Sequence, residues 1–137
     1  MRKDARKVAF SLIYEYFFTN TKDDLELEQF IQMTDADDTV FEIDDSDKEY
    51  IKDVYNNVID NFDKYRQKVA ELAKGFREER LFKVDFAILM MAFFELEAKI
   101  TPLPVVINEA VNLAKLYSTE NSSGFINGIL AEYAKKI

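Results

Sequence analysis

The chain has 137 residues, of which 48% are hydrophobic and 14% aromatic. This is enough apolar material for one compact domain. There is no Cys and no His, which excludes disulfides, thiolate nucleophiles, Cys/His zinc sites and every catalytic scheme that requires an imidazole. Because the chain holds only 3 Gly and 2 Pro, a turn-rich β-sandwich or a glycine-dependent nucleotide fold is disfavoured, and a mostly helical chain is expected.

The net charge of −8 is unevenly distributed along the sequence. Residues 1–21 carry +2, residues 22–49 carry −10, and residues 50–137 are neutral overall. Outside the acidic segment the chain is slightly basic, so a surface that binds RNA is compatible with the composition. We see neither a cleavable secretory signal nor a run of about 18 apolar residues, and we therefore expect a cytoplasmic protein without a membrane span.

Apolar residues recur at helical spacing along most of the chain. This periodicity predicts an all-α fold of six helices, or of seven if the long third helix breaks near Asn61. The expected ranges are 3–18, 24–33, 50–72, 83–98, 104–117 and 125–135, with an acidic loop over 34–45. The helix over 83–98 is apolar nearly all round, which predicts that it is central and buried.

Several residues have the character of helix boundaries. Ser46 and Glu49 have the spacing of a capping box ahead of the long helix. Pro104 suits the first turn of a helix. The residues before the last helix include three good N-cap candidates, Asn121, Ser122 and Ser123.

One flank of the first helix combines cations with aromatic rings. On a helical wheel, five residues fall within about 100° of each other: Lys3, Arg6, Lys7, Phe10 and Tyr14. Single-stranded RNA is bound by this combination, because cations contact phosphates while rings stack on unpaired bases. The competing interpretation is that the rings are peripheral core and the cations form a solvated face.

The acidic residues also have two interpretations. A calcium site in the segment 34–49 is disfavoured because no Gly occupies the turning position of an EF-hand loop. Glu95, Glu97 and Glu109 are the candidates if the chain is instead a metal enzyme based on carboxylates. Polar residues inside apolar helices, at 108–109 and 127–128, are more often buried structural groups, with Gly128 allowing close packing of helices.

Three segments of the second half resemble a known family. They are PVVINEAVNLAK at 104–115, ENSSGFINGIL at 120–130 and VDFAILMMAFFEL at 84–96. The first two closely resemble the signature of the NusB family of bacterial transcription antitermination factors, and the third resembles the preceding helix of that family. Ala5-Arg6 and Leu12-Ile-Tyr14 resemble its first helix, so the resemblance covers the whole chain, weakly across 22–60.

The resemblance implies a fold of two small helical subdomains, here 1–75 and 76–137, without catalytic activity or a cofactor. It implies that the protein binds the boxA element of ribosomal RNA leader transcripts together with NusE, a ribosomal protein, within an antitermination complex of RNA polymerase. The RNA-binding residues carried over from the family are Arg2, Lys3, Arg6, Tyr14, Asn121, Ser122, Ser123 and Phe125. The helical wheel adds Lys7, and the residue that resembles a NusE contact is Asp85.

The chain departs from the family pattern at several positions. Phe86 and Met90 stand where the family often has arginines, Asn121 replaces a frequent acid, and Gly124 replaces a frequent lysine. The runner-up interpretation is a stand-alone helical RNA-binding module related to the one that precedes the methyltransferase domain in rRNA cytosine methyltransferases. A monomer and a homodimer are both compatible with the apolar helix faces.

Overall fold

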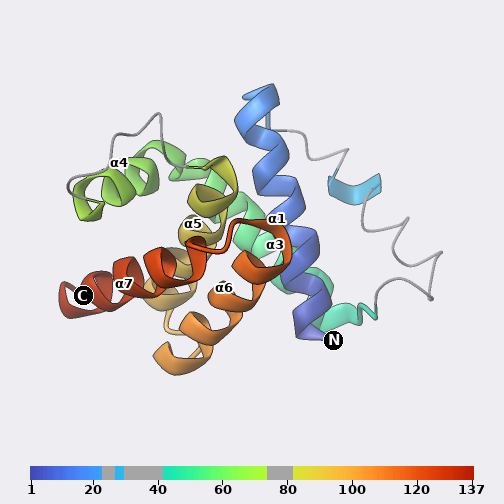
Figure 1. The fold of residues 1–137 in the computed structure, drawn as a ribbon. Helices are drawn as coiled ribbons and strands as arrows, with labels where there is room; N and C mark the ends of the chain where they lie inside the picture. The colour runs from blue at the N-terminus through green and yellow to red at the C-terminus, as the bar shows by residue number, and fades with distance from the viewer. Residues whose placement is uncertain (23–26, 30–41, 74–81) are drawn as a thin grey trace. The chain divides into compact units, whose positions relative to one another are not determined.

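All the regular elements that the structure describes are helices. In this computed structural model, residues 1–137 are described except for 23–26, 30–41 and 74–81 (Figure 1). The elements are α1 (Arg2–Thr19), α3 (Asp45–Asp60), α4 (Phe62–Leu72), α5 (Lys83–Ala98), α6 (Leu103–Tyr117) and α7 (Ser122–Lys135). The predicted all-α fold is confirmed. No helix within the described ranges is long and apolar enough to cross a membrane.

The chain divides into two compact units, Met1–Ile59 and Asp60–Ile137. The predicted subdomain boundary after residue 75 falls within 74–81, outside the described residues, and stays a prediction. The helix expected over 24–33 and the acidic loop over 34–45 also lie largely outside them. Within these two segments, residues 27–29 are helical and Leu27 is buried.

The first unit contains α1 and α3, whose apolar stripes are buried. On α1 these residues include Ala5, Val8, Ala9, Leu12 and Ile13. The helix ends as predicted, because Asn20 adopts a left-handed conformation with φ 52° and its backbone N–H bonds to the carbonyl of Tyr16 at 2.8 Å. Asn is among the residues that tolerate this conformation best.

The predicted capping box at Ser46 and Glu49 is wrong. The helix α3 starts at Asp45, and the reciprocal bonds join Asp44 and Asp47. The Asp44 carboxylate accepts the N–H of Asp47 at 2.7 Å, and the Asp47 carboxylate accepts the N–H of Asp44 at 3.3 Å. The capping arrangement is therefore kept but begins two residues earlier, because two aspartates three apart satisfy the equivalent backbone donors, the N–H groups of Asp44 and Asp47.

The predicted break in the long helix is confirmed. The helix α3 ends at Asp60, α4 starts at Phe62, and Asn61 between them has a non-helical backbone.

Within the second unit, α5 is the central element. It contacts α4, α6 and α7, and nearly all its side chains from Asp85 to Leu96 are buried, including Phe86, Leu89, Met90 and Phe93. This confirms the prediction from its apolar composition. Pro102 precedes α6 and Pro104 lies in its first turn, where a missing N–H costs no hydrogen bond.

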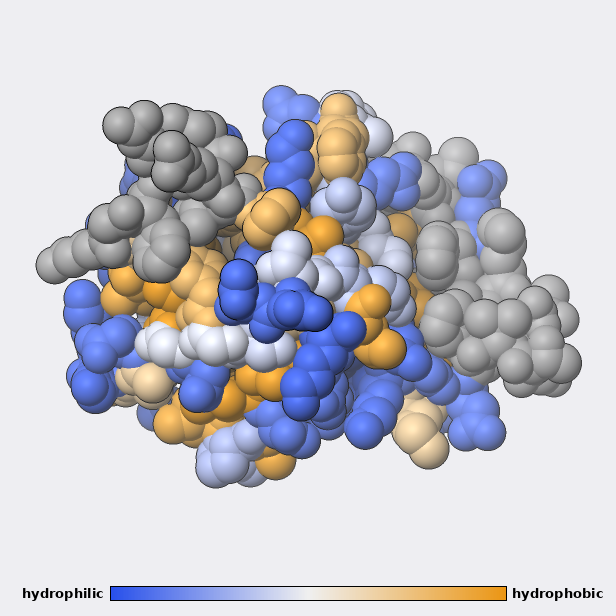
Figure 2. Space-filling model, viewed as in Figure 1, coloured by the Kyte–Doolittle hydropathy of each residue, from blue (hydrophilic) through white to orange (hydrophobic). Residues whose placement is uncertain are grey.

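The polar residues expected to be buried within α6 and α7 are mostly at the surface. Asn108, Asn127 and Gly128 are exposed, and a Cβ at Gly128 would meet nothing within 4 Å. Gly128 therefore does not serve close helix packing, contrary to the prediction. Figure 2 shows polar and apolar residues interspersed on one face of the molecule. On α6, the large apolar residues that are exposed are Leu103, Val105, Leu116 and Tyr117.

Candidate functional site

The exposed face of α1 carries lysines at one end and aromatic residues at the other. Lys3 is exposed, and Lys7 and Tyr14 are half-buried. The ammonium group of Lys7 lies 3.9 Å from the Asp4 carboxylate, one turn earlier. Phe18 follows Tyr14 by four residues and is 61% exposed, so it lies on the same face.

Three of the aromatic residues of α1 form a continuous row, which runs from the buried Phe10 through the half-buried Tyr14 to the exposed Phe18. The rings of Phe10 and Tyr14 are stacked, with centroids 5.8 Å apart and an angle of 15° between their planes. Tyr14 and Phe18 meet edge to face at 5.1 Å. Because both neighbours hold the Tyr14 ring, its orientation on the helix surface is restricted.

The two arginines of α1 lie beside an aromatic ring of α3. The guanidinium carbons of Arg2 and Arg6 are 4.4 and 5.5 Å from the centroid of the Tyr50 ring, within the range of a cation–π contact. Arg2 also donates to Ser46 at 3.1 Å and pairs with Asp47 at 3.3 Å. Arg6 is only 6% exposed, which makes it part of the packing between α1 and α3.

Asp47 joins the start of α1 to the start of α3. Its buried carboxylate is 2.9 Å from the α-ammonium group of Met1. Burial raises the pKa of this carboxyl, but the bonds from the Met1 ammonium and the Asp44 N–H and the charge of Arg2 outweigh it, so the pKa lies below the ordinary value of 3.8. Asp47 is therefore ionised at neutral pH and holds Arg2 in place.

The turn before α7 is bound to the first turn of α5. The Asp85 carboxylate accepts hydrogen bonds from the hydroxyls of Ser118 at 2.6 Å and Ser122 at 2.9 Å, and Ser122 also contacts the Thr119 hydroxyl at 2.9 Å. Both Asp85 and Ser122 are buried. Of the three predicted caps, none makes a side-chain cap bond from the N-cap position, which Asn121 occupies. The hydroxyl of Ser122 is directed to Asp85 instead.

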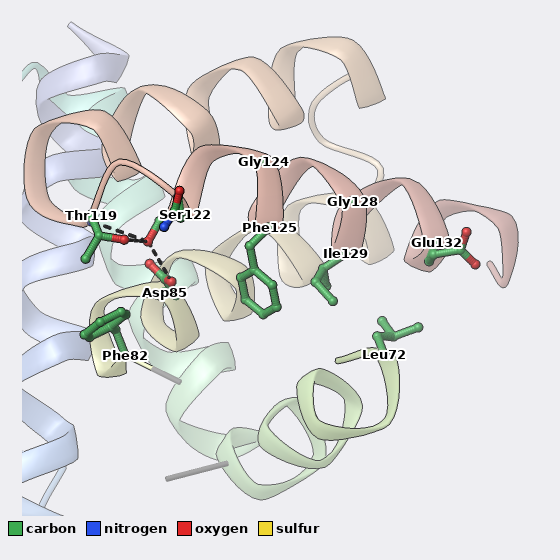
Figure 3. A pocket seen from close by; sticks show the side chains of 11 residues that line it. Leu72, Phe82, Asp85, Thr119, Ser122, Gly124, Phe125, Gly128, Ile129 and Glu132 are labelled. Carbon is green, nitrogen blue, oxygen red and sulfur yellow. Dashed lines mark hydrogen bonds between the residues drawn. The ribbon is translucent and has the colours of Figure 1, made fainter. Parts of the chain in front are cut away.

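The remaining predicted residues, at the N-cap position and in the first turn of α7, lie nearer the surface. Asn121 is exposed, whereas Ser123 and Phe125 are half-buried. Asn121, Ser122 and Phe125 line a groove of about 510 Å³ together with Leu72, Phe82, Asp85, Thr119, Gly124, Gly128, Ile129 and Glu132. Figure 3 shows Phe125 and Ile129 pointing from α7 into this groove, with Leu72 facing them from the end of α4.

Two of the three glutamates considered for a metal enzyme, Glu95 and Glu97, accept hydrogen bonds within the second unit. The Glu97 carboxylate accepts hydrogen bonds from the hydroxyls of Tyr65, at 2.8 Å, and Tyr133. The pKa of both tyrosines is raised above its ordinary value. Burial is the larger cause, and the hydrogen bond to Glu97 and the charge of that residue add to it. Glu95 accepts a hydrogen bond from Thr101 at 3.1 Å. The described part of the chain holds no group of three or more His, Cys, Asp or Glu that could bind a metal ion.

Comparison with known proteins identifies the family. The model of the NusB family matches residues 3–135. The chain belongs to the NusB family. Its relatives include the transcription antitermination protein NusB of Acetivibrio thermocellus, which is 36% identical over 98% of this chain and 88% of the relative.

Solved structures of the NusB family have the same fold. A NusB from T. maritima matches with a TM-score of 0.81 and 28% identity, over 99% of this chain and 92% of that one. A structure of the antitermination factors NusB and NusE in complex with double-stranded RNA matches with a TM-score of 0.78, over 99% and 97% of the two chains. At 22% identity, this second likeness shows the fold alone.

The apolar residues that the sequence analysis noted on α5 belong to the core of the second unit. Phe86 and Met90, at positions where the resemblance leads us to expect arginines, are buried at 4% and 0% exposure. Apolar side chains at these positions need no ionic partner inside the protein, so the exchange leaves no unpaired charge.

Three contributors to these surfaces are missing from the sequence-based set. Phe18 lies four residues after Tyr14, and its spacing alone places it on the same face. Ser118 and Tyr50 carry no comparable sequence signal, because Ser118 is 33 positions from Asp85 and Tyr50 lies on a different helix from Arg2 and Arg6.

Proposed function

We propose that this protein is an antitermination factor that binds boxA-type, single-stranded RNA of ribosomal RNA leader transcripts together with NusE. In this proposal it holds the leader RNA near RNA polymerase in the cytoplasm, so that ribosomal RNA operons are transcribed to their ends. The observation that carries the proposal is the face of α1 on which Lys3, Lys7 and the half-buried ring of Tyr14 occur together, in a member of the NusB family.

On the first helix, the proposed roles follow from exposure. Lys3 and Lys7 contact phosphates, because an ammonium group at the surface attracts the RNA backbone without reading its sequence. Tyr14 stacks on a base. Arg2, whose side chain is 39% exposed, contributes positive charge at the end of this face. For Arg6 the burial favours a contribution through the orientation of α1.

The N-cap residue of α7 and the first turn of that helix supply the proposed second contact region. Asn121 offers an exposed amide and Phe125 a half-buried ring, which are suited to the edge and the face of an unpaired base. Ser122 holds the turn through Asp85, and Ser123 lies beside it. The replacement of a frequent acid by Asn121 removes repulsion from phosphates, whereas Gly124 removes a cation.

The proposed NusE contact is Asp85. Its carboxylate lines the groove of the second unit although its side chain is 4% exposed. A NusE side chain that enters the groove would reach this charge. We expect Asp85→Ala to weaken the association with NusE while the helical circular dichroism is retained, and the loss should be smaller at high salt if the partner group is a cation.

Asp85→Asn distinguishes a charge contact from a purely internal role. The amide keeps hydrogen-bonding capacity toward Ser118 and Ser122 but removes the charge. Weakened NusE binding by both variants supports the contact. If NusE binds Asp85→Ala as it binds the unaltered protein, its interface lies elsewhere.

The experiment that tests the function measures fluorescence anisotropy of a labelled boxA-like single strand with and without NusE. Because only a small part of this acidic protein is basic, we expect weak binding by the chain alone and tighter binding with NusE, and RNA should tighten NusE binding by the same factor. Equal RNA affinity with and without NusE would favour the stand-alone RNA-binding module instead. A scrambled strand and a duplex of the same sequence serve as competitors, and preference for either would contradict recognition of a single-stranded boxA.

The Tyr14→Ala variant tests the site itself. Loss of a stacked base should weaken RNA binding by about 5- to 150-fold, while the dependence on salt stays nearly unchanged. Tyr16→Ala is the matched control, since both tyrosines are half-buried on α1 and lie on different faces. If Tyr14→Ala lowers thermal stability without an effect on RNA, the ring belongs to the core.

A further inference from the structure

The aromatic row of α1 extends beyond the residues that the family resemblance assigns. Phe18 ends this row and is 61% exposed, so it is not a peripheral core residue. A single exposed phenylalanine is ordinary in a soluble protein. What distinguishes Phe18 is its place on the same helix face as Tyr14, Lys7 and Lys3.

The geometry of the row favours Phe18 as a stacking surface. The Tyr14 ring is stacked against Phe10 at 5.8 Å and meets Phe18 edge to face at 79°. The Tyr14 ring is thus in contact with both neighbours, whereas more than half of the Phe18 surface faces solvent. The Phe18 backbone lies one helical turn, about 6 Å, beyond that of Tyr14, which places its ring at a different point along a bound strand.

We propose that Phe18 is a base-stacking residue that extends the RNA-binding face of α1 by one nucleotide beyond Tyr14. The inference rests on the proposed RNA function and adds a residue to that surface. The occupant is an unpaired base of the RNA: the lysines at the other end of the face attract phosphates, while a ring without a polar group binds any base through its π-face. From Lys3 to Phe18 the face is about 22 Å long, enough for several nucleotides.

The test compares Phe18→Leu with Phe18→Trp in the full-length protein with NusE present. Leu keeps an apolar side chain but removes the ring, so we expect RNA binding to weaken about 5- to 150-fold, with the salt dependence unchanged. Trp keeps a ring and should bind RNA at least as tightly as Phe. Leu116→Ala on α6, which is 60% exposed, is the control for the loss of an exposed apolar side chain and should leave RNA binding unchanged.

A second measurement locates the contact on the RNA. The probe is the boxA-like strand with 2-aminopurine, a base whose fluorescence falls when it stacks, placed at one position after another. At one position, next to the nucleotide quenched through Tyr14, we expect quenching that Phe18→Leu abolishes. Removal of that nucleotide should weaken binding to the unaltered protein and have no effect on Phe18→Leu.

Several outcomes overturn the proposal. One is Phe18→Leu binding RNA as tightly as the unaltered protein. Another is a loss of RNA binding that is accompanied by an equal loss of NusE binding without RNA, which would assign the ring to the protein partner. A loss that is matched by a lower melting temperature would assign it to folding. If the unaltered protein with NusE binds no boxA-like strand at all, the proposed function fails first, and this inference fails with it.

Discussion

The Ser122 hydroxyl donates a hydrogen bond of 2.9 Å to the carboxylate of Asp85, which precedes it by 37 positions. The bond joins the first turns of α7 and α5, and it holds the segment that carries Asn121 and Phe125. Because both residues are buried, the carboxylate depends on protein hydroxyls rather than on water for its hydrogen bonds. The position of this turn is therefore set by the core of the second unit.

Replacing Ser122 should weaken that unit. Ser122→Ala removes one donor from a buried carboxylate, and a hydrogen bond to a charged group contributes about 1.5–3 kcal/mol. Ser123→Ala is the control, since the Ser123 side chain is only half-buried. Urea unfolding should show a lower midpoint for Ser122→Ala than for Ser123→Ala, and equal midpoints would mean that Ser118 alone satisfies Asp85.

The buried Arg6 of α1 should contribute more to the stability of the folded protein than to the electrostatic attraction of RNA. Arg6 is 6% exposed and lies beside Tyr50, so Arg6→Ala removes both packing and a cation–π contact. We expect a lower melting temperature, by an amount that corresponds to about 1–3 kcal/mol. Lys3→Ala, at an exposed position of the same helix, should leave the melting temperature unchanged, and a reversed order would contradict the packing role.

Lys7 should reveal the phosphate contact through salt. If Lys7 neutralises one phosphate, Lys7→Ala makes the slope of log affinity against log salt shallower by about 0.7, the value for a single strand. The measurement is RNA binding with NusE at several KCl concentrations. Lys115→Ala, an exposed cation on α6, provides the comparison and should leave the slope as it is. An unchanged slope for Lys7→Ala would remove Lys7 from the RNA surface.

Replacing Gly128 by alanine should stabilise the protein. A methyl group at this position meets nothing within 4 Å, and alanine is favoured over glycine inside a helix by about 0.5–1 kcal/mol. Gly128→Ala is therefore expected to raise the melting temperature, and Ala131→Gly, at an exposed position of the same helix, should lower it by a similar amount. A decrease for Gly128→Ala would show that the glycine serves a close contact.

Acid should weaken the first unit through Asp47. The pKa of this carboxyl is lowered in the folded protein from its ordinary value of 3.8, so its contribution to stability is present above about pH 4 and is lost as the pH falls through the folded-state pKa. Asp47→Asn should be less stable at neutral pH, and the difference should shrink toward pH 3. Melting curves between pH 7 and pH 3 measure this, with the exposed Asp53→Asn as the control. A difference that does not vary with pH would exclude the ionised carboxylate as its cause.

Much of the helical architecture is determined locally and is readable in the sequence. The range 83–98 coincides with α5. The burial of this helix was also predictable, because a helix with apolar residues on all sides is not stable at the surface. The break at Asn61, the end of α1 at Asn20 and the start of α6 after Pro102 follow from residues that stop or begin a helix by their own backbone chemistry. The start of α3 differs from the prediction because Ser46-x-x-Glu49 and Asp44-x-x-Asp47 both have capping spacing, and the choice between them depends on Arg2, which bonds to Ser46 and pairs with Asp47 from another helix.

The candidate site depended on the tertiary structure to a greater degree. The helical wheel groups Lys3, Arg6 and Lys7 on one flank, but only contacts with α3 show that Arg6 is covered beside Tyr50. The inward direction of Ser122 likewise depends on Asp85. A sequence determines the angle at which a side chain leaves its own helix, because that angle follows from local backbone geometry. Whether the side chain then meets water, RNA or another helix is decided by segments distant in sequence, since burial requires the surfaces of separate elements to come together.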